Sequence, residues 1–304
     1  MRLFFNMMRV PNLAMIALTF LLLRYLVFFK VYNAYQYIPE GGSMNFLLMV
    51  IATLLIAAAG YISNDYFDVI TDRVNKPGKL YIGKQVSAGS ALAIAMMLSA
   101  IAIILSTWLS LRMRSYLPAT LLMVALMVAW WYAVQLKKSF LWGNIAVSCM
   151  TAGTIAMAWL IEKQGSPVPA EVSGIISAIV AAISIFAFLL SMLREIVKDM
   201  EDMEGDRLIH CRSLPLRKGI GFTKTVLMLI AAFTFLLLSI AQFWLIRLGN
   251  NAAALWVIAG VELPLLYFVF SLKKATTKPN FHTLSTLLKC IMLGGLLTIL
   301  AGQF

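Results

Sequence analysis

Long apolar runs dominate the chain, and short polar segments separate them. Nine of these runs reach roughly 20 residues, the length that a helix needs to cross about 30 Å of hydrocarbon. They cover residues 10–33, 44–64, 88–111, 116–135, 140–161, 172–197, 222–246, 252–271 and 283–303. The pattern therefore predicts an all-α membrane protein with nine transmembrane helices in one bundle.

The composition agrees with this prediction. Hydrophobic residues make up 62% of the 304 residues and charged residues only 12%, whereas a soluble domain averages about 25% charged residues. We expect residues 1–304 to form a single domain, because the ~150-residue units of soluble proteins do not apply to a bundle packed in lipid. The net charge of +12 lies in short loops between apolar runs, as topology signals do, so no nucleic-acid partner is expected.

The loop charges predict the orientation of the chain in the membrane. With the N-terminus in the cytoplasm and the sides alternating, 17 of the 25 Lys and Arg residues lie inside, 5 lie outside and 3 fall within spans. This bias follows the positive-inside rule. It also places the two longest inside connections, residues 65–87 and 198–221, as cytoplasmic caps on the bundle. No small-residue cleavage pattern ends the first run, so we expect an uncleaved first span.

Two acidic stretches follow the second and sixth runs and share one spacing. In each, three aspartates step by three and then four residues, and an arginine follows the last. The two sets are Asp65, Asp68, Asp72 with Arg73, and Asp199, Asp202, Asp206 with Arg207. At 100° per residue, the three aspartates share one narrow face if the helix continues through them. The offset of 134 residues indicates a weak internal repeat, with coincidence as the alternative.

Carboxylates gathered at one membrane face repel one another unless cations lie between them. The three cysteines and two histidines show no metal-ligand spacing, which favours a hard cation with oxygen ligands. Mg²⁺ usually bridges one or two carboxylates to substrate phosphates. We therefore predict that all six aspartates bind Mg²⁺ and that the two clusters together hold a diphosphate.

Nearby basic and amide side chains are predicted to bind the diphosphate oxygens, or to orient the metal-binding carboxylates or the phosphate. These candidates are Asn64, Arg73, Lys76, Lys79, Lys198 and Arg207. On the same helical wheel Glu195 shares the face of Asp199, whereas Glu201 and Glu204 point away and are excluded. The lysines and arginine of the first loop can instead be topology determinants alone. Arg24, within the first span, can snorkel or bind an acidic ligand group from inside the bundle.

The two acidic stretches resemble the aspartate motifs of the UbiA superfamily of intramembrane prenyltransferases. The first reads Asn64-Asp65-x-x-Asp68-x-x-x-Asp72-Arg73-x-Asn75-Lys76-Pro77, and the second runs from Lys198-Asp199 to Gly205-Asp206. Weaker similarities occur at Arg9-Val10-Pro11-Asn12, at Tyr132 with Lys137, at Gly143-Asn144 and at Ser213-Leu214-Pro215.

The resemblance implies nine helices around a central cavity, Mg²⁺ as cofactor, and transfer of a prenyl group from a prenyl diphosphate to a small acceptor in the bilayer. It implies catalytic roles for the six aspartates, with Tyr132 and Lys137 near the reacting centre. It also makes Asn12 and Asn144 candidates for substrate binding. One departure affects the phosphate contacts, because many members continue the first motif with Arg-Pro-Leu where this chain has Lys79-Leu80-Tyr81.

The second motif, from Arg194 to Asp206, is most similar to the branch that makes digeranylgeranylglyceryl phosphate. This similarity implies a geranylgeranyl or longer donor and an acceptor such as geranylgeranylglyceryl phosphate. Prenylation of an aromatic acid or quinone precursor, of the hydroxybenzoate or dihydroxynaphthoate type, is the alternative. The sequence does not set the oligomeric state.

Two other classes of membrane protein use acidic residues. The CDP-alcohol phosphotransferases carry a different string of glycines and aspartates within one helix pair, and that string is absent here. A divalent-cation transporter is the non-enzyme alternative. Its acidic residues would line a pore across the membrane, whereas these are predicted to cluster on one side.

Overall fold

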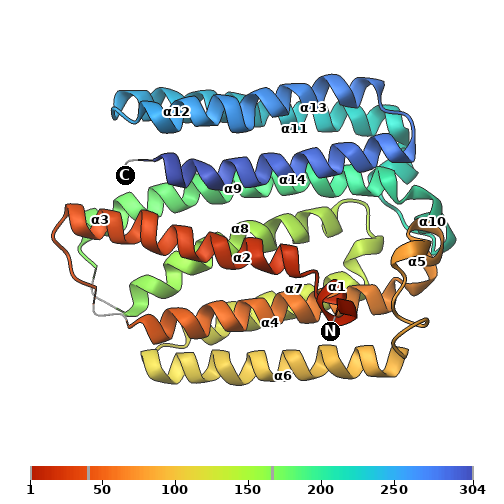
Figure 1. Ribbon diagram of the computed structural model, residues 1–304, viewed down its shortest axis with the longest axis horizontal. Helices are drawn as coiled ribbons and strands as arrows, with labels where there is room; N and C mark the ends of the chain where they lie inside the picture. The colour runs from red at the N-terminus through yellow and green to blue at the C-terminus, as the bar shows by residue number, and fades with distance from the viewer. Residues whose placement is uncertain (1, 40–41, 166–167, 303–304) are drawn as a thin grey trace.

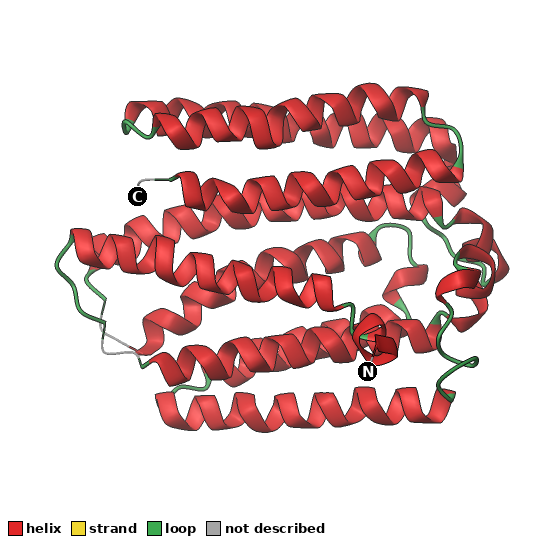
Figure 2. Ribbon diagram, viewed as in Figure 1, coloured by secondary structure: helices red, strands yellow, loops and turns green. Residues whose placement is uncertain are grey.

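The computed structural model describes residues 2–39, 42–165 and 168–302, and that part of the chain is helical, with loops and no β-strand (Figure 2). It contains nine helical stretches long and apolar enough to cross a membrane, as the sequence predicts. They are Val10–Ala34, Ser43–Phe67 (α4), Ala88–Met113 (α6), Leu117–Val134 (α7), Trp142–Gly165, Ala170–Glu201 (α9), Leu214–Arg247 (α11), Asn251–Lys274 and Lys278–Ala301 (α14).

Three of these stretches are composite, and shorter helices join the others. The first stretch consists of α2 (Val10–Leu22), the π-helical η1 (Leu23–Phe28) and α3 (Phe29–Ala34). The fifth and eighth stretches consist of α8 (Trp142–Glu162) with η4 (Lys163–Gly165), and of α12 (Asn251–Val257), η5 (Ile258–Glu262) and α13 (Leu263–Lys274). The short helices are α1 (Arg2–Met7), α5 (Val69–Asn75), η2 (Pro77–Lys79), η3 (Leu136–Lys138) and α10 (Met203–Leu208).

The long helices lie side by side with their axes close to parallel (Figure 1). α4 packs on α6 and α7, whereas α9 packs on α8, α11 and α14. In Figure 1, α6 lies at one edge of the bundle and α11 to α13 lie at the opposite edge. The short helices α5 and α10 contact each other at one end of the bundle. The bundle therefore brings the ends of the second and sixth spans together.

Each acidic stretch bends at its second aspartate. α4 ends at Phe67 and α5 begins at Val69, with Asp68 between them at φ −92° and ψ 2°. α9 ends at Glu201 and α10 begins at Met203, with Asp202 at φ −95° and ψ 6°. The condition of an unbroken helix, under which the three aspartates of each set share one narrow face, is therefore not met. Aspartate favours such breaks because its side chain competes for backbone hydrogen bonds. The similar angles at Asp68 and Asp202 show that the internal repeat also holds for the backbone conformation.

An asparagine joins the two short helices that follow these bends. The Asn75 Nδ2 atom donates to the backbone oxygen of Asp202 at 2.9 Å, and its Oδ1 atom accepts from the Gly205 N–H at 3.0 Å. A Cβ atom at Gly205 would lie 2.5 Å from Asn75 Nδ2 and 2.7 Å from the Thr71 oxygen. Because no side chain fits that space, the glycine allows α5 and α10 to approach closely. These contacts hold the two motifs at a fixed position relative to each other.

Candidate active site

All six predicted aspartates line one cavity of about 1730 Å³. The cavity begins beside α5 and α10 and continues between the long helices, where α2, α4, α7, α8, α9 and α14 supply much of its wall. Aliphatic side chains line the part away from the aspartates, among them Leu122, Val128, Ile155, Ile179, Ile183 and Leu296. Ligand cavities typically measure about 300–1,000 Å³, so this one has room for more than a single small molecule.

The first aspartate cluster is surrounded by cations and an amide. Arg9 Nη2 donates to Asp65 Oδ1 at 2.6 Å. Asn64 Nδ2 donates to Asp68 Oδ2 at 2.6 Å, and the Lys137 ammonium donates to the same oxygen. Lys137 comes from η3, the connection between α7 and α8. Two distant segments therefore converge on the end of α4.

The second cluster is linked to the first through a lysine. Lys76 Nζ lies 3.2 Å from Asp202 Oδ2 and 3.7 Å from Asp72 Oδ1, so one ammonium bridges the two motifs. Asn144 Nδ2 donates to Asp199 Oδ2 at 2.8 Å. Asn144 does not line the cavity itself, but the Asp199 carboxylate to which it donates does line it. The predicted pairing of the two motifs at one site is thus present in the geometry.

Burial and neighbouring charges shift the pKa values of groups at the end of the bundle. Burial raises the pKa of Asp206 to about 6, against the opposing effect of Lys137. Burial also raises the pKa of Asp72. Burial alone would lower the pKa of Lys137. The adjacent Asp68 carboxylate outweighs this effect and holds the pKa of Lys137 above its ordinary value. The site therefore has carboxylates whose charge is costly without cations.

The donor set of the site fits Mg²⁺ bound together with a substrate diphosphate. No three His, Cys, Asp or Glu side chains in the described part of the chain form a metal site by themselves. Mg²⁺, however, is commonly held by one or two carboxylates, water and substrate phosphates. Asp202 Oδ1 and Asp206 Oδ1 are buried and have no hydrogen-bond partner. Such oxygens are suitable ligands for a hard cation.

Several predicted residues are brought to the cavity and others are not. Asn12, Asn64, Lys76, Tyr132, Lys137 and Lys198 line it. Arg73 and Arg207 are exposed and lie outside its lining, and the side chain of Lys79 is outside the described part of the structure. Roles for these three in substrate binding stay predictions. The exclusion of Glu201 is wrong, because it lines the cavity and contacts His282 at 2.8 Å. Glu204 is exposed and lies outside the lining, as predicted.

Arg24 lies within the bundle and does not line the cavity. It is only 2% exposed, with its guanidinium 4.3 Å from the centre of the Phe46 ring and its Nη2 atom 4.0 Å from Glu162 Oε1. The first span is π-helical at this position. Arg24 therefore packs inside the bundle against an aromatic ring and a carboxylate, and it is not snorkelled to the surface.

Two arginines at the cavity were missed by the reasoning from sequence. Arg9 precedes the first span, and only the fold brings it to Asp65. Arg194 lies 140° from Asp199 on a helical wheel, yet it lines the same cavity and donates from Nη1 to Glu195 Oε1 at 2.6 Å. A charged residue within a predicted span is itself a signal of function, and that signal identifies Arg194.

Comparisons with known proteins agree with this geometry. A family model described as the UbiA prenyltransferase family matches residues 13–290. A digeranylgeranylglyceryl phosphate synthase from Pyrococcus furiosus is 31% identical over 71% of this chain and 70% of its own length. The synthase of the same name from Methanothermobacter thermautotrophicus is 33% identical over 64% of each chain.

Solved structures resemble the chain over nearly its whole length. One described as a digeranylgeranylglyceryl phosphate synthase has a TM-score of 0.64 and 22% identity, covering 99% of this chain and 97% of that one. A UbiA homologue from Archaeoglobus fulgidus, solved with DMAPP and Mg²⁺, has a TM-score of 0.59 and 15% identity, covering 97% and 98%. At these identities the likeness establishes a shared fold.

Proposed function

This chain belongs to the UbiA prenyltransferase family, and we propose that it transfers a geranylgeranyl or longer group from a prenyl diphosphate to a glyceryl phosphate lipid. The observation that carries the proposal is the convergence of both aspartate motifs on one large cavity with aliphatic walls. The relatives named digeranylgeranylglyceryl phosphate synthase support the acceptor class. The six aspartates line one cavity, and α5 and α10, which carry the last aspartate of each motif, lie together at one end of the bundle (Figure 1). This arrangement favours a transferase over a transporter.

The polar end of the cavity would bind the diphosphate. The six aspartates would hold Mg²⁺, and Arg9, Lys76, Lys137 and Lys198, which line the same cavity, would supply donors for the diphosphate oxygens. Bound Mg²⁺ would stabilise the negative charge that develops on the leaving diphosphate. Asn64 and Asn144 hold Asp68 and Asp199 in place by hydrogen bonds. Amides in such positions fix the orientation of the ligating carboxylates.

The aliphatic part of the cavity would hold the prenyl chain and exclude water. As the bond between C1 and the diphosphate oxygen breaks, the diphosphate leaves with the electron pair and C1 gains positive charge. Exclusion of water protects this centre from hydrolysis. Tyr132 lines the cavity from α7, where the face of its ring can stabilise a nearby cation. The acceptor hydroxyl oxygen then forms the new bond to C1 and gives up its proton, which the departing diphosphate can accept.

A panel of substrates tests the proposed function. Purified protein with Mg²⁺ is given labelled geranylgeranyl diphosphate and, in separate reactions, geranylgeranylglyceryl phosphate, hydroxybenzoate or dihydroxynaphthoate. We expect diphosphate release and a labelled lipid product with the glyceryl phosphate acceptor. Product formed only with an aromatic acceptor would contradict the assignment of the acceptor class. A shorter donor, such as dimethylallyl diphosphate, measures the preference for chain length.

We further propose that the N-terminus and both aspartate motifs face the cytoplasm, as the distribution of loop charges indicates. Single cysteines at positions 78 and 165, in a variant without the native cysteines, are expected to react with an impermeant thiol reagent from opposite sides of the membrane. Position 78 lies in η2 beside the first motif, whereas position 165 is the last residue of η4 and of the fifth span. Labelling of both positions from one side would disprove this topology.

A further inference from the structure

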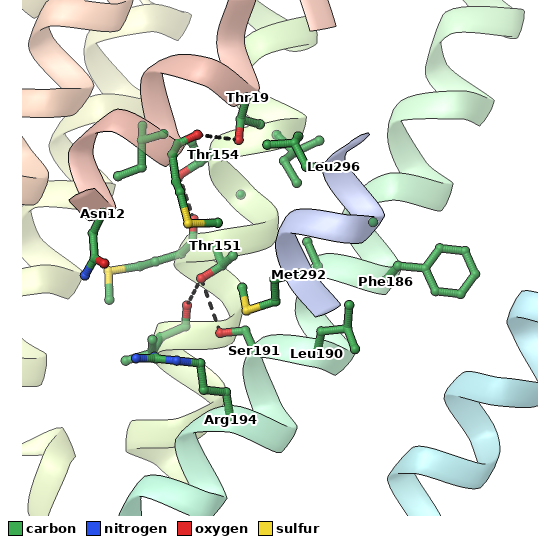
Figure 3. A pocket seen from close by; sticks show the side chains of 18 of the residues that line it. Asn12, Thr19, Thr151, Thr154, Phe186, Leu190, Ser191, Arg194, Met292 and Leu296 are labelled. Atoms are coloured by element: carbon green, nitrogen blue, oxygen red, sulfur yellow. Dashed lines mark hydrogen bonds between the residues drawn. The ribbon is translucent and has the colours of Figure 1, made fainter. Parts of the chain in front are cut away.

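We infer that Arg194, with the Ser191 hydroxyl, forms the subsite that binds the phosphate group of the acceptor lipid. This inference rests on the proposed function and adds to it the residues that recognise the acceptor. Figure 3 shows Arg194, Ser191 and Thr151 grouped on one side of the cavity. All three line the cavity. They lie on the parts of α8 and α9 within the membrane-spanning stretches.

The guanidinium of Arg194 is only partly used within the protein. Its Nη1 atom donates to Glu195 Oε1 at 2.6 Å, while its Nε atom is buried without a hydrogen-bond partner. The edge formed by Nε and Nη2 is the side-on fork with which arginine binds two oxygens of a phosphate or carboxylate. A buried donor without a partner is unfavourable. A ligand on this edge would satisfy it.

Arg194 shares its carboxylate partner with a second cation. The Glu195 carboxylate pairs with two cations, Arg194 and Lys198, because its Oε2 atom also accepts from Lys198 Nζ at 3.1 Å. Arg9, the next cation along the wall, is paired with Asp65. One carboxylate is thus shared by two cations. The free edge of Arg194 and the lipid-sized cavity favour an anionic group that belongs to a long-chain acceptor.

A hydroxyl beside Arg194 can contribute a further donor. Thr151 Oγ1 donates to the Val147 oxygen at 3.0 Å, and it lies 3.3 Å from Ser191 Oγ. Because the Thr151 hydrogen is already used, Ser191 is the donor in this contact. A phosphate oxygen is a charged and therefore stronger acceptor, toward which the Ser191 hydroxyl can turn its hydrogen from Thr151. Ser191 and Arg194 are three residues apart on α9 and so lie on neighbouring positions of one face. Together they offer donors to more than one phosphate oxygen.

The position of this subsite matches the acceptor better than the diphosphate. Arg194 precedes Asp199 by five residues, which corresponds to about 7.5 Å along the helix axis. The subsite is therefore further into the membrane than the aspartates that would hold the diphosphate. An acceptor phosphate bound at Arg194 would leave a glycerol backbone to bring the free hydroxyl toward the prenyl C1.

The test uses full-length protein in detergent and compares wild type with Arg194→Gln. Binding of geranylgeranylglyceryl phosphate and of the same lipid without its phosphate is measured by calorimetry, and KM is measured for donor and acceptor. Loss of a charge-assisted contact is expected to weaken binding of the phosphorylated lipid by about 10- to 100-fold. Binding of the unphosphorylated lipid and the KM of the donor should change less than twofold. Arg194→Lys should recover part of the loss.

Arg247→Gln is the matched control, because Arg247 ends α11, is exposed and does not line the cavity. It should behave as wild type. Equal weakening of both lipids in Arg194→Gln, or an unchanged affinity for the phosphorylated lipid, would overturn the inference. If Arg194→Gln weakened only the binding of hydroxybenzoate, the group recognised would be a carboxylate and the inference would also fail. The binding measurement gives this result even if wild type shows no prenyl transfer, an outcome that would count against the proposed function alone.

Discussion

Asp65→Asn and Asp199→Asn are each expected to reduce turnover by roughly 10²- to 10³-fold, the loss seen when one group that stabilises a developing charge is removed. Asparagine keeps the shape of the side chain but removes a carboxylate that would bind Mg²⁺. Asp65 accepts from Arg9 and Asp199 accepts from Asn144, so each is held toward the cavity from a different segment. If the two motifs form one site, the two substitutions should have effects of similar size.

Glu204→Gln is the matched control for these two variants. It removes one negative charge from the same acidic stretch, but Glu204 is exposed and absent from the cavity lining. Its turnover should stay within twofold of wild type. Tm measurements on all three variants show whether the fold is retained. Wild-type turnover in either folded aspartate variant would disprove a site made from both motifs.

Removal of divalent cations is expected to abolish turnover, with full recovery when Mg²⁺ is returned. Without the metal, the diphosphate would enter a site lined by six aspartates. Two unit charges 4 Å apart repel by about 4 kcal/mol at an effective dielectric constant of 20, which corresponds to a factor of about 10³ in binding. The lysines and arginine of the site offset part of this repulsion. The loss should therefore appear in donor binding as well as in turnover.

Titration of the chelated protein with a non-reactive prenyl diphosphate analogue separates the effect of Mg²⁺ on donor binding from its effect on turnover. The analogue should raise Tm when Mg²⁺ is present and should have little effect when it is absent. Unchanged turnover after exhaustive chelation, verified by metal analysis, would rule out a metal-dependent reaction. The same titration with Asp199→Asn should require a higher Mg²⁺ concentration. Such a shift would assign part of the metal binding to the second motif.

The sequence by itself determined the membrane spans and the chemistry of the motifs. A helix must be apolar over about 20 residues to cross a bilayer, so the nine runs were visible without any tertiary contact and the structure has nine spans in its described part. The spacing of the aspartates was equally local. It identified the six aspartates that line the cavity.

Only the tertiary structure decided which cations meet those carboxylates and where the helices bend. Arg9 and Lys137 reach Asp65 and Asp68 across 56 and 69 residues of chain, respectively, and no local pattern encodes such pairs. A helical wheel assumes an unbroken helix, yet both helices break at the second aspartate, where Asn75 joins α5 to α10. A wheel also places Arg194 140° from Asp199, and it cannot show that a long side chain reaches a cavity enclosed by other helices. Spans and motifs follow from local hydrophobicity and spacing, whereas the partners within the site follow from packing between distant segments.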